Sequence, residues 1–275
     1  MMFSEDEWVV FIVSGIIVFF GFLGQLLTGK PRLYLRNTSA SGLVRLSVLL
    51  SMGWVVYVLY NHADPSVVGA YRMFYILLGL AVIFIFGLGG AGRTGMRNGV
   101  DVMERNNPAA GVLIAAFVLA TGMIYGGSLW GEADPDGDGE GGWWIPMGFF
   151  ISGWISLCIA TVLFRRRETS SITRRIRQMR NPREALGFAL YLLSSGWILC
   201  EAVAGDFYGW KQGLTTVGAI GGMLVTHEVI GMIFSRNEAV KPRAMTGIEV
   251  ISYIAWGVGF SVVNRYVLPS WGIQL

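Results

Sequence analysis

Eight long apolar stretches, separated by short polar ones, run through this chain. Each is about 20 residues long or slightly longer, and a helix of that length crosses the roughly 30 Å hydrocarbon core of a bilayer. Only 14% of the residues are charged and 53% are hydrophobic. The pattern predicts an all-α integral membrane protein with eight transmembrane helices. The predicted spans are roughly residues 8–28, 42–61, 69–92, 108–130, 143–164, 185–204, 212–234 and 245–267.

The basic residues concentrate in alternate polar connections. Those after the first, third, fifth and seventh stretches contain 17 of the 21 Lys and Arg residues. Because cytoplasmic loops carry an excess of basic residues, we expect these four connections in the cytoplasm and both termini on the extracytoplasmic side. Residues 5–7 are Glu-Asp-Glu, not the basic start of a cleaved signal peptide. The first stretch is therefore expected to stay in the mature protein.

The even-numbered stretches begin alike. Their lead-ins combine Asn or Pro with a following Gly, and Asn is a good helix N-cap while Pro suits the first helical turn. A second similarity relates Leu50-Ser-Met-Gly-Trp54 to Leu193-Ser-Ser-Gly-Trp197. The lead-ins are Asn37-Thr-Ser-Ala-Ser-Gly42, Asn107-Pro-Ala-Ala-Gly111, Asn181-Pro-Arg-Glu-Ala-Leu-Gly187 and Lys241-Pro-Arg-Ala-Met-Thr-Gly247.

These similarities predict four helical hairpins grouped as two four-helix membrane halves. The first half would be residues 1–133 and the second residues 143–275, with an acidic outer linker at residues 134–142. Because each half has an even number of spans, both lie the same way up, which favours parallel repeats over inverted ones.

One stretch carries a family resemblance. Glu104-Arg-Asn-Asn-Pro-Ala-Ala-Gly-Val-Leu-Ile-Ala-Ala-Phe-Val-Leu-Ala-Thr-Gly122 resembles the last helix of the YjfL-type family, four-helix inner-membrane proteins of unknown function. The lead-in at Asn37 is similar to an earlier one of that family, whereas Asn181-Pro-Arg-Glu184 departs from its Ala-rich pattern. The resemblance implies a tandem-duplicated relative in the bacterial inner (plasma) membrane. It implies no activity and no site residue.

A few ionisable residues fall inside the apolar spans, where a charged side chain costs roughly 2.5 to 3.5 kcal/mol at mid-bilayer. Arg45, His227, Glu228 and Glu249 lie at similar depth near the cytoplasmic ends of their spans. One hypothesis is a proton or cation relay that faces a wet cavity. The alternative is ion pairing between helices near the headgroups, since long side chains can reach them.

Two acidic residues mark the outer side of the second half. Glu201 lies in the outer half of the sixth span and Asp206 follows it. They could begin an outer vestibule. Alternatively, they pair with Arg72 or Arg265 at the outer interface.

The acidic outer linker contains Asp134, Asp136 and Asp138, followed by Gly139, as an EF-hand loop begins. Ile145 stands where such a loop needs its bidentate glutamate. A flexible linker is therefore the favoured interpretation, with weak calcium binding as the alternative.

The connection after the fifth span is rich in arginine. Ile172, Ile176 and Met179 follow helical spacing among these arginines. The pattern predicts a short helix lying on anionic lipid headgroups. Docking of an acidic cytoplasmic partner is the alternative, and nucleic acid is not an expected ligand. The candidate docking residues are Arg165, Arg166, Arg167, Arg174, Arg175 and Arg177.

Several common membrane sites do not fit. The two histidines, His62 and His227, lie at different depths, which excludes bis-histidine haem, and no span contains the lysine that a retinal Schiff base needs. We therefore expect no cofactor and no enzymatic activity. The leading hypothesis is proton- or cation-coupled transport, or a channel, through the polar residues of the second half. The alternative is a scaffold or partner-binding subunit that associates with other membrane subunits.

Overall fold

The computed structural model describes residues 3–28, 39–131, 142–167, 172–204, 210–234 and 247–267. All regular secondary structure in these ranges is helical. Eight helical segments are long and apolar enough to cross a membrane, which confirms the predicted number of spans. The α-helices are α1 Glu5–Thr28, α2 Ser39–Asn61, α3 Ala70–Val82, α4 Pro108–Ser128, α5 Trp144–Arg167, α6 Ile172–Arg177, α7 Pro182–Val203, α8 Trp210–Phe234 and α9 Gly247–Val262.

The third span is not one regular α-helix. After α3 it continues as a π-helical turn η2 (Ile83–Leu88) and a 3₁₀ turn η3 (Gly90–Thr94), and a second π-helical turn η4 (Asn98–Glu104) leads into α4. A Cβ on Gly90 would lie 2.8 Å from the indole of Trp154 on α5. The glycine thus leaves room for the Trp154 indole against the backbone at this irregular stretch. A last π-helical turn, η5 (Val263–Val267), follows α9.

Asparagine side chains begin two of the even-numbered spans, as predicted. Asn107 accepts hydrogen bonds from the backbone N–H groups of Ala109 and Ala110, and Asn181 accepts one from Arg183. In both helices a proline occupies the first turn. The cap satisfies N–H groups that have no partner within the helix. The lead-ins at Asn37 and Lys241 begin outside the described residues.

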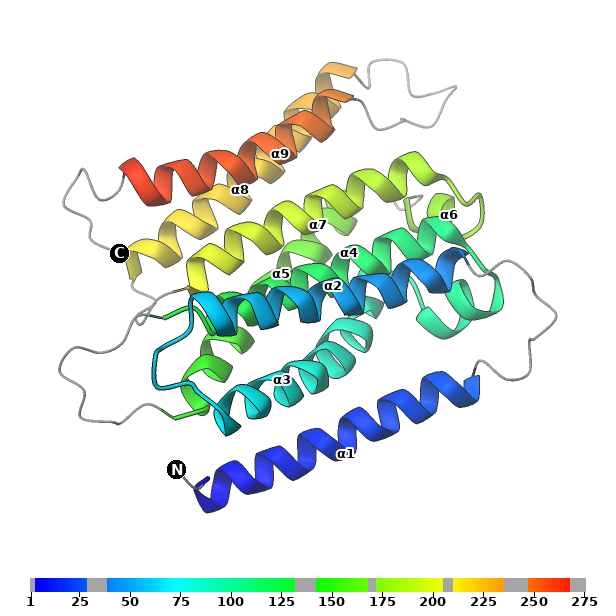
Figure 1. The fold of residues 1–275 in the computed structure, drawn as a ribbon. Coiled ribbons are helices and arrows are strands. Elements are labelled where there is room, and N and C mark those ends of the chain that lie inside the picture. The colour runs from blue at the N-terminus through cyan, green and yellow to red at the C-terminus, as the bar shows by residue number, and fades with distance from the viewer. Residues whose placement is uncertain are drawn as a thin grey trace.

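Four helices that run in the same direction lie side by side. Figure 1 shows α2, α4, α7 and α9 in this order, with α4 between α2 and α7. Within the membrane window of α4, 83% of the residues are buried, compared with 6% for α1. α4 is therefore the central helix, and α1 packs mainly against α3 at one edge.

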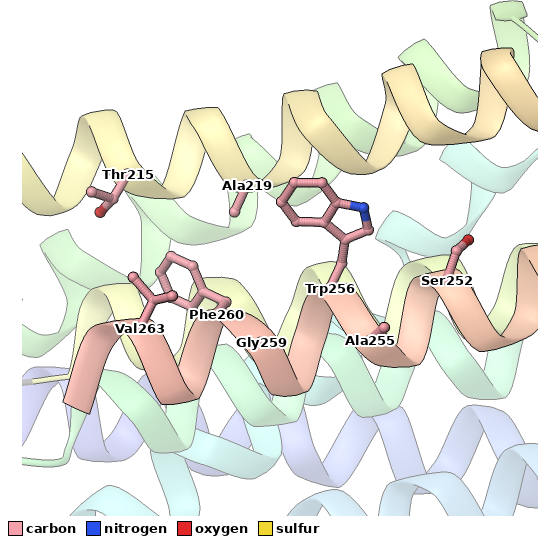
Figure 2. Close-up of a pocket in the computed structure, with 8 residues that line it drawn as sticks. All are labelled: Thr215, Ala219, Ser252, Ala255, Trp256, Gly259, Phe260 and Val263. Carbon is pink, nitrogen blue, oxygen red and sulfur yellow. The ribbon is translucent and has the colours of Figure 1, made fainter. Parts of the chain in front are cut away.

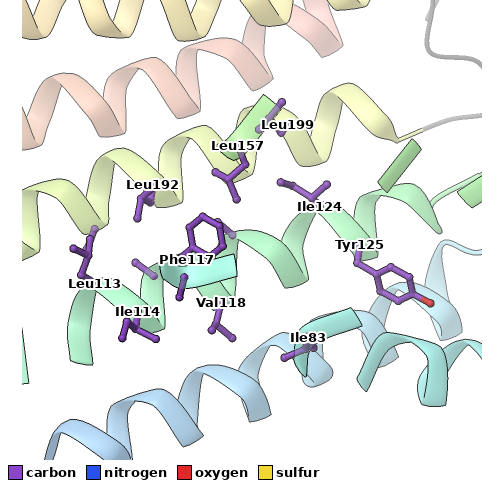
Figure 3. Packing of buried hydrophobic residues seen from close by; sticks show 14 of the residues in the cluster. Ile83, Leu113, Ile114, Phe117, Val118, Ile124, Tyr125, Leu157, Leu192 and Leu199 are labelled. Carbon is purple, nitrogen blue, oxygen red and sulfur yellow. The ribbon is translucent and has the colours of Figure 1, made fainter. Parts of the chain in front are cut away.

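The hydrophobic core is continuous from the first part of the chain to the second. On α4, Phe117 points toward Leu157 of α5 and Leu192 of α7, whereas Val118 points toward Ile83 of η2 (Figure 3). Because α4 and α7 come from the two predicted halves, those halves share one core. The outer faces of α1, α2, α8 and α9 expose large apolar side chains, as expected of surfaces in contact with lipid.

Candidate functional site

Three polar side chains of α8 and α9 meet in the interior of the protein. Nδ1 of His227 lies 2.5 Å from the phenol oxygen of Tyr253 and 3.7 Å from Oε1 of Glu249. The exposed fraction is 3% for His227, 0% for Tyr253 and 1% for Glu249. His227 and Tyr253 share a hydrogen bond whose donor depends on the histidine tautomer. We call His227, Glu249 and Tyr253 the buried polar cluster.

Aromatic rings enclose this cluster from α5 and α7. The ring of Phe164 on α5 has its centroid 4.8 Å from that of His227, and it stacks at 4.4 Å on Tyr191 of α7. Phe188, one turn earlier on α7, stacks on the same Phe164 ring at 4.6 Å. All three aromatic side chains are at most 1% exposed. The buried polar cluster is therefore surrounded by packed side chains from four helices.

The buried polar cluster contains side chains that can bind and release a proton. The imidazole and the phenol share a hydrogen bond, the carboxyl group lies 3.7 Å from the imidazole, and burial makes a lone charge costly there. If Glu249 is ionised, a protonated His227 compensates its charge. Either way the three side chains connect α8 to α9 and, through Phe164, to α5.

Two residues expected in this site do not join the buried polar cluster. Arg45 is exposed on α2, and α4 and α7 lie between α2 and α9 (Figure 1). Glu228 is half-buried on α8. Because it directly follows His227, its side chain leaves the helix about 100° away from that of His227. Of the four residues expected together, the structure brings His227 close to Glu249, and Tyr253 joins them. Tyr253 is a member of the cluster that the sequence analysis did not single out.

The outer acidic residue has a basic partner. Oε1 of Glu201 on α7 lies 3.0 Å from Nη2 of Arg265 and accepts a hydrogen bond of 2.9 Å from Ser261. Trp197 donates to the same Ser261 hydroxyl at 2.6 Å. This geometry is that of a helix-to-helix ion pair at the outer end of α7 and α9. Asp206, the other expected member of a vestibule, lies outside the described residues.

The arginine-rich connection after the fifth span folds onto the protein. Ile172 and Ile176 of α6 are 4% and 0% exposed and belong to the hydrophobic core. The stripe expected to lie on lipid therefore packs against protein, and of its three residues only Met179 is exposed. The physical reason is that side chains of α4 and α7 bury this face.

The arginines of this connection are largely engaged. Arg175 pairs with Glu184 at the start of α7, and Arg177 pairs with Asp101 of η4 at 2.8 Å. Arg165 donates to the Arg93 carbonyl. Arg174 contacts Gln178, Arg166 is exposed, and the side chain of Arg167 lies outside the described residues.

The residues of the calcium hypothesis, Asp134, Asp136 and Asp138, lie outside the described residues. Elsewhere, in the part of the chain that the structure describes, no group of three His, Cys, Asp or Glu side chains could hold a metal ion.

An apolar groove opens between α8 and α9 (Figure 2). It has a volume of about 510 Å³. Its polar edge includes Ser252, and Trp256 stands over it with the indole N–H bonded to Thr226 at 3.0 Å. None of the buried polar cluster lines it, so the groove and the cluster are separate features. The lining residues are Thr215, Ala219, Ser252, Ala255, Trp256, Gly259, Phe260 and Val263.

The helical fold and its eight membrane-length spans are those of a multi-pass membrane protein. Residues 67–203 match DUF350, a domain of unknown function. The DUF350 match runs from the start of α3 to the end of α7 and so includes α4, the docked α6 and the acidic connection between the predicted halves. Comparisons with curated proteins and with solved structures gave no match.

The DUF350 match supports the expectation of an uncharacterised membrane-protein family. It assigns no substrate and no site residue. The buried polar cluster lies outside the matched segment, because His227, Glu249 and Tyr253 all follow residue 203. The aromatic residues that enclose it, Phe164, Phe188 and Tyr191, lie inside residues 67–203.

Proposed function

We propose that this chain is a structural subunit of the bacterial inner membrane, a helical scaffold without catalytic chemistry. The observation that carries the proposal is the enclosure of the buried polar cluster. Transport of protons or cations through ionisable side chains requires water or a hydrogen-bonded path to reach them. His227, Glu249 and Tyr253 are at most 3% exposed, and aromatic rings pack around them.

The chemistry of the cluster is consistent with a structural role. Its three side chains come from the cytoplasmic part of two neighbouring helices that pack less tightly into the core than α4 does. A hydrogen bond of 2.5 Å between His227 and Tyr253 and a contact of 3.7 Å between His227 and Glu249 connect α8 to α9 there. Removing one partner of a buried hydrogen bond costs about 1 to 3 kcal/mol, because the other polar group loses that partner.

The proposed topology places both termini outside and the basic connections in the cytoplasm. Contacts between two of these connections support it, since Arg177 of α6 pairs with Asp101 of η4. The connections after the third and fifth spans are thus on the same side of the helices. Their basic residues favour the cytoplasmic side. We retain the two parallel halves and their tandem origin as parts of this proposal.

Proton-coupled transport is the second candidate function. One observation favours it: a histidine and a carboxylate lie 3.7 Å apart inside membrane-length helices, where ionisable residues are costly and often functional. Under this alternative, Glu249 and His227 would exchange a proton during a conformational change that admits water to the cluster.

Reconstituted vesicles distinguish the two candidates. The full chain is placed in liposomes containing a pH-sensitive dye, and an inward proton gradient is imposed with and without a potassium potential. The scaffold proposal predicts the same dye response as in empty liposomes. A proton flux in the wild type that disappears in Glu249→Gln and in Tyr253→Phe, but persists in Glu228→Gln, would contradict the scaffold and establish the relay.

A further inference from the structure

The four parallel helices α2, α4, α7 and α9 share one short sequence pattern. In each, a Leu or Ile is followed by Ser or Ala, then by any residue, then by Gly. The segments are Leu50-Ser-Met-Gly53, Leu119-Ala-Thr-Gly122, Leu193-Ser-Ser-Gly196 and Ile254-Ala-Trp-Gly257. Because the helices also lie in this order in the structure, neighbours can be compared position by position (Figure 1).

The same contact joins each helix to the preceding one. A Cβ on Gly122 of α4 would lie 2.5 Å from Cβ of Ser51 on α2. In α7, a Cβ on Gly196 would lie 2.6 Å from Cβ of Ala120 on α4. The glycine of one helix thus meets the small residue of the helix before it. Close backbone approach through small residues is a main source of helix association in membranes.

The third junction, between α7 and α9, has the same contact at a longer distance. A Cβ on Gly257 of α9 would lie 3.7 Å from Cβ of Ser194 on α7. Tryptophans add to the first and third junctions: the Trp54 indole N–H donates to the Met123 carbonyl of α4, and that of Trp197 to Ser261 beyond the α9 glycine. Three successive junctions therefore use equivalent positions.

At the two ends of the row, α2 has the glycine of this contact and α9 has its small residue, and neither meets a counterpart on a neighbouring helix of the row. On α2, Gly53 has nothing within 4 Å of its Cβ position, and the same is true of Gly42, which corresponds to Gly111 of α4. On α9, Ala255 occupies the position of Ser51 and Ala120, yet it is exposed beside the apolar groove (Figure 2).

The exposed fractions of nearby side chains also differ between the end helices of the row and its inner helices. Leu49 of α2 is 69% exposed, whereas its counterparts Val118 on α4 and Leu192 on α7 are 0% exposed. Ile251 of α9 is 67% exposed, whereas its counterpart Ala116 on α4 is 3% exposed. A glycine inside a helix is less favourable than alanine, and for Gly42 and Gly53 no contact among the described residues offsets this cost.

We propose that copies of this protein associate head to tail in the membrane, with α2 of one copy packed against α9 of the next. Gly53 of the first copy then meets Ala255 of the second, and the row of parallel helices continues across the junction. Since α2 and α9 run in the same direction, both copies stand the same way up in the bilayer. This assembly rests on the proposed scaffold function and names its partner, a second copy of the chain.

The proposal commits to a second copy because the two exposed faces complement each other as neighbouring helices of the row do. Such a contact joins two different surfaces of identical chains, so it generates rings if it closes and filaments if it does not. A two-fold symmetric dimer would instead pair α2 with α2 or α9 with α9. That difference makes the proposal testable with cysteines.

Disulfide crosslinking in membranes tests the junction. Two differently tagged chains, one with Gly53→Cys and one with Ala255→Cys, are co-expressed in a Cys158→Ser background and oxidised. The expected result is a crosslinked pair containing both tags, with no crosslinked product from either variant alone. Replacing Ala255→Cys by Val225→Cys, an exposed position of α8 near the same depth, should abolish the product. Crosslinking of one variant with itself, or none in the mixed sample, would overturn the proposal.

A second measurement uses the purified protein in lipid nanodiscs or mild detergent. Gly53→Leu should reduce the assembly to single chains by native mass spectrometry, whereas Gly148→Leu, at an exposed open glycine of α5, should leave its size unchanged. Neither substitution meets a neighbour within the chain, so both variants should fold. Single chains in the wild type, or unchanged assemblies of Gly53→Leu, would refute head-to-tail packing. Either result leaves the scaffold proposal standing, because the vesicle measurement of proton flux decides that separately.

Discussion

Arg177 and Asp101 lie on two different inner connections, and their side chains meet at 2.8 Å. The carboxylate of Asp101 is fully buried, and its other oxygen accepts a hydrogen bond of 2.9 Å from the backbone N–H of Arg97. Arg105 approaches the same carboxylate at 3.6 Å. Asp101 therefore holds η4, α6 and the start of α4 together.

Asp101→Ala should destabilise the protein more than an exposed substitution nearby. The change leaves buried donors without an acceptor, which costs about 1 to 3 kcal/mol. Arg97→Ala, four residues earlier and exposed, keeps its backbone N–H and should change the stability by less than about 0.5 kcal/mol. Thermal unfolding in nanodiscs measures both. Equal effects of the two substitutions would show that the Asp101 contacts contribute nothing.

Because α6 packs against the core, substitutions along its apolar stripe should change the stability of the protein by amounts that depend on how buried each residue is. Ile176→Ala should cost about 2 to 5 kcal/mol, because Ile176 is 0% exposed in the core. Met179→Ala should be nearly neutral, since Met179 is 68% exposed. Unfolding midpoints in detergent give the comparison. If the stripe instead rested on lipid, both substitutions would weaken vesicle binding of the connection and neither would greatly change unfolding.

The closest helix contact in the row should be sensitive to added volume. Gly122→Val places a Cβ 2.5 Å from that of Ser51 and forces α2 and α4 apart. Overpacking of this kind typically costs 1 to 3 kcal/mol. Gly148→Val, which meets nothing within 4 Å, is the matched control and should unfold near the wild-type midpoint. A wild-type midpoint for Gly122→Val would mean that α2 and α4 do not pack at this distance.

The topology follows from labelling with a membrane-impermeant thiol reagent. In intact cells, Asp138→Cys should react, because the acidic linker is expected outside, whereas Ser170→Cys should be protected until the cells are opened. The unsubstituted chain provides the background, since Cys158 and Cys200 lie in α5 and α7. Labelling in the reverse order would invert the proposed orientation.

The sequence was sufficient for features that depend on local chemistry. Apolar length predicted eight spans, and the asparagines at Asn107 and Asn181 predicted two helix starts that the structure confirms. Both signals act over a few neighbouring residues. The same local pattern identified the apolar stripe of the inner connection, although it could not say whether lipid or protein covers that stripe.

Features that depend on the order of helices in space were not predictable in this way. Depth along the chain places Arg45 and Glu249 at one height, but α4 and α7 stand between their helices (Figure 1). Depth also gave no sign that Phe164 of α5 would lie over His227. Which helices become neighbours is decided by close packing of small residues, and that information is distributed over distant segments.

Water access to His227 tests the central claim most directly. The chain has two histidines, and His62, which stacks on Trp130 at the outer end of α2, serves as an internal reference. In nanodiscs with ¹⁵N-labelled histidine, NMR measures how fast each imidazole exchanges its N–H proton with water, and a His62→Gln variant assigns the signals. The scaffold account predicts slow exchange at His227 and fast exchange at His62. Fast exchange at His227, comparable to that of His62, would show that water reaches the buried polar cluster and would contradict the account.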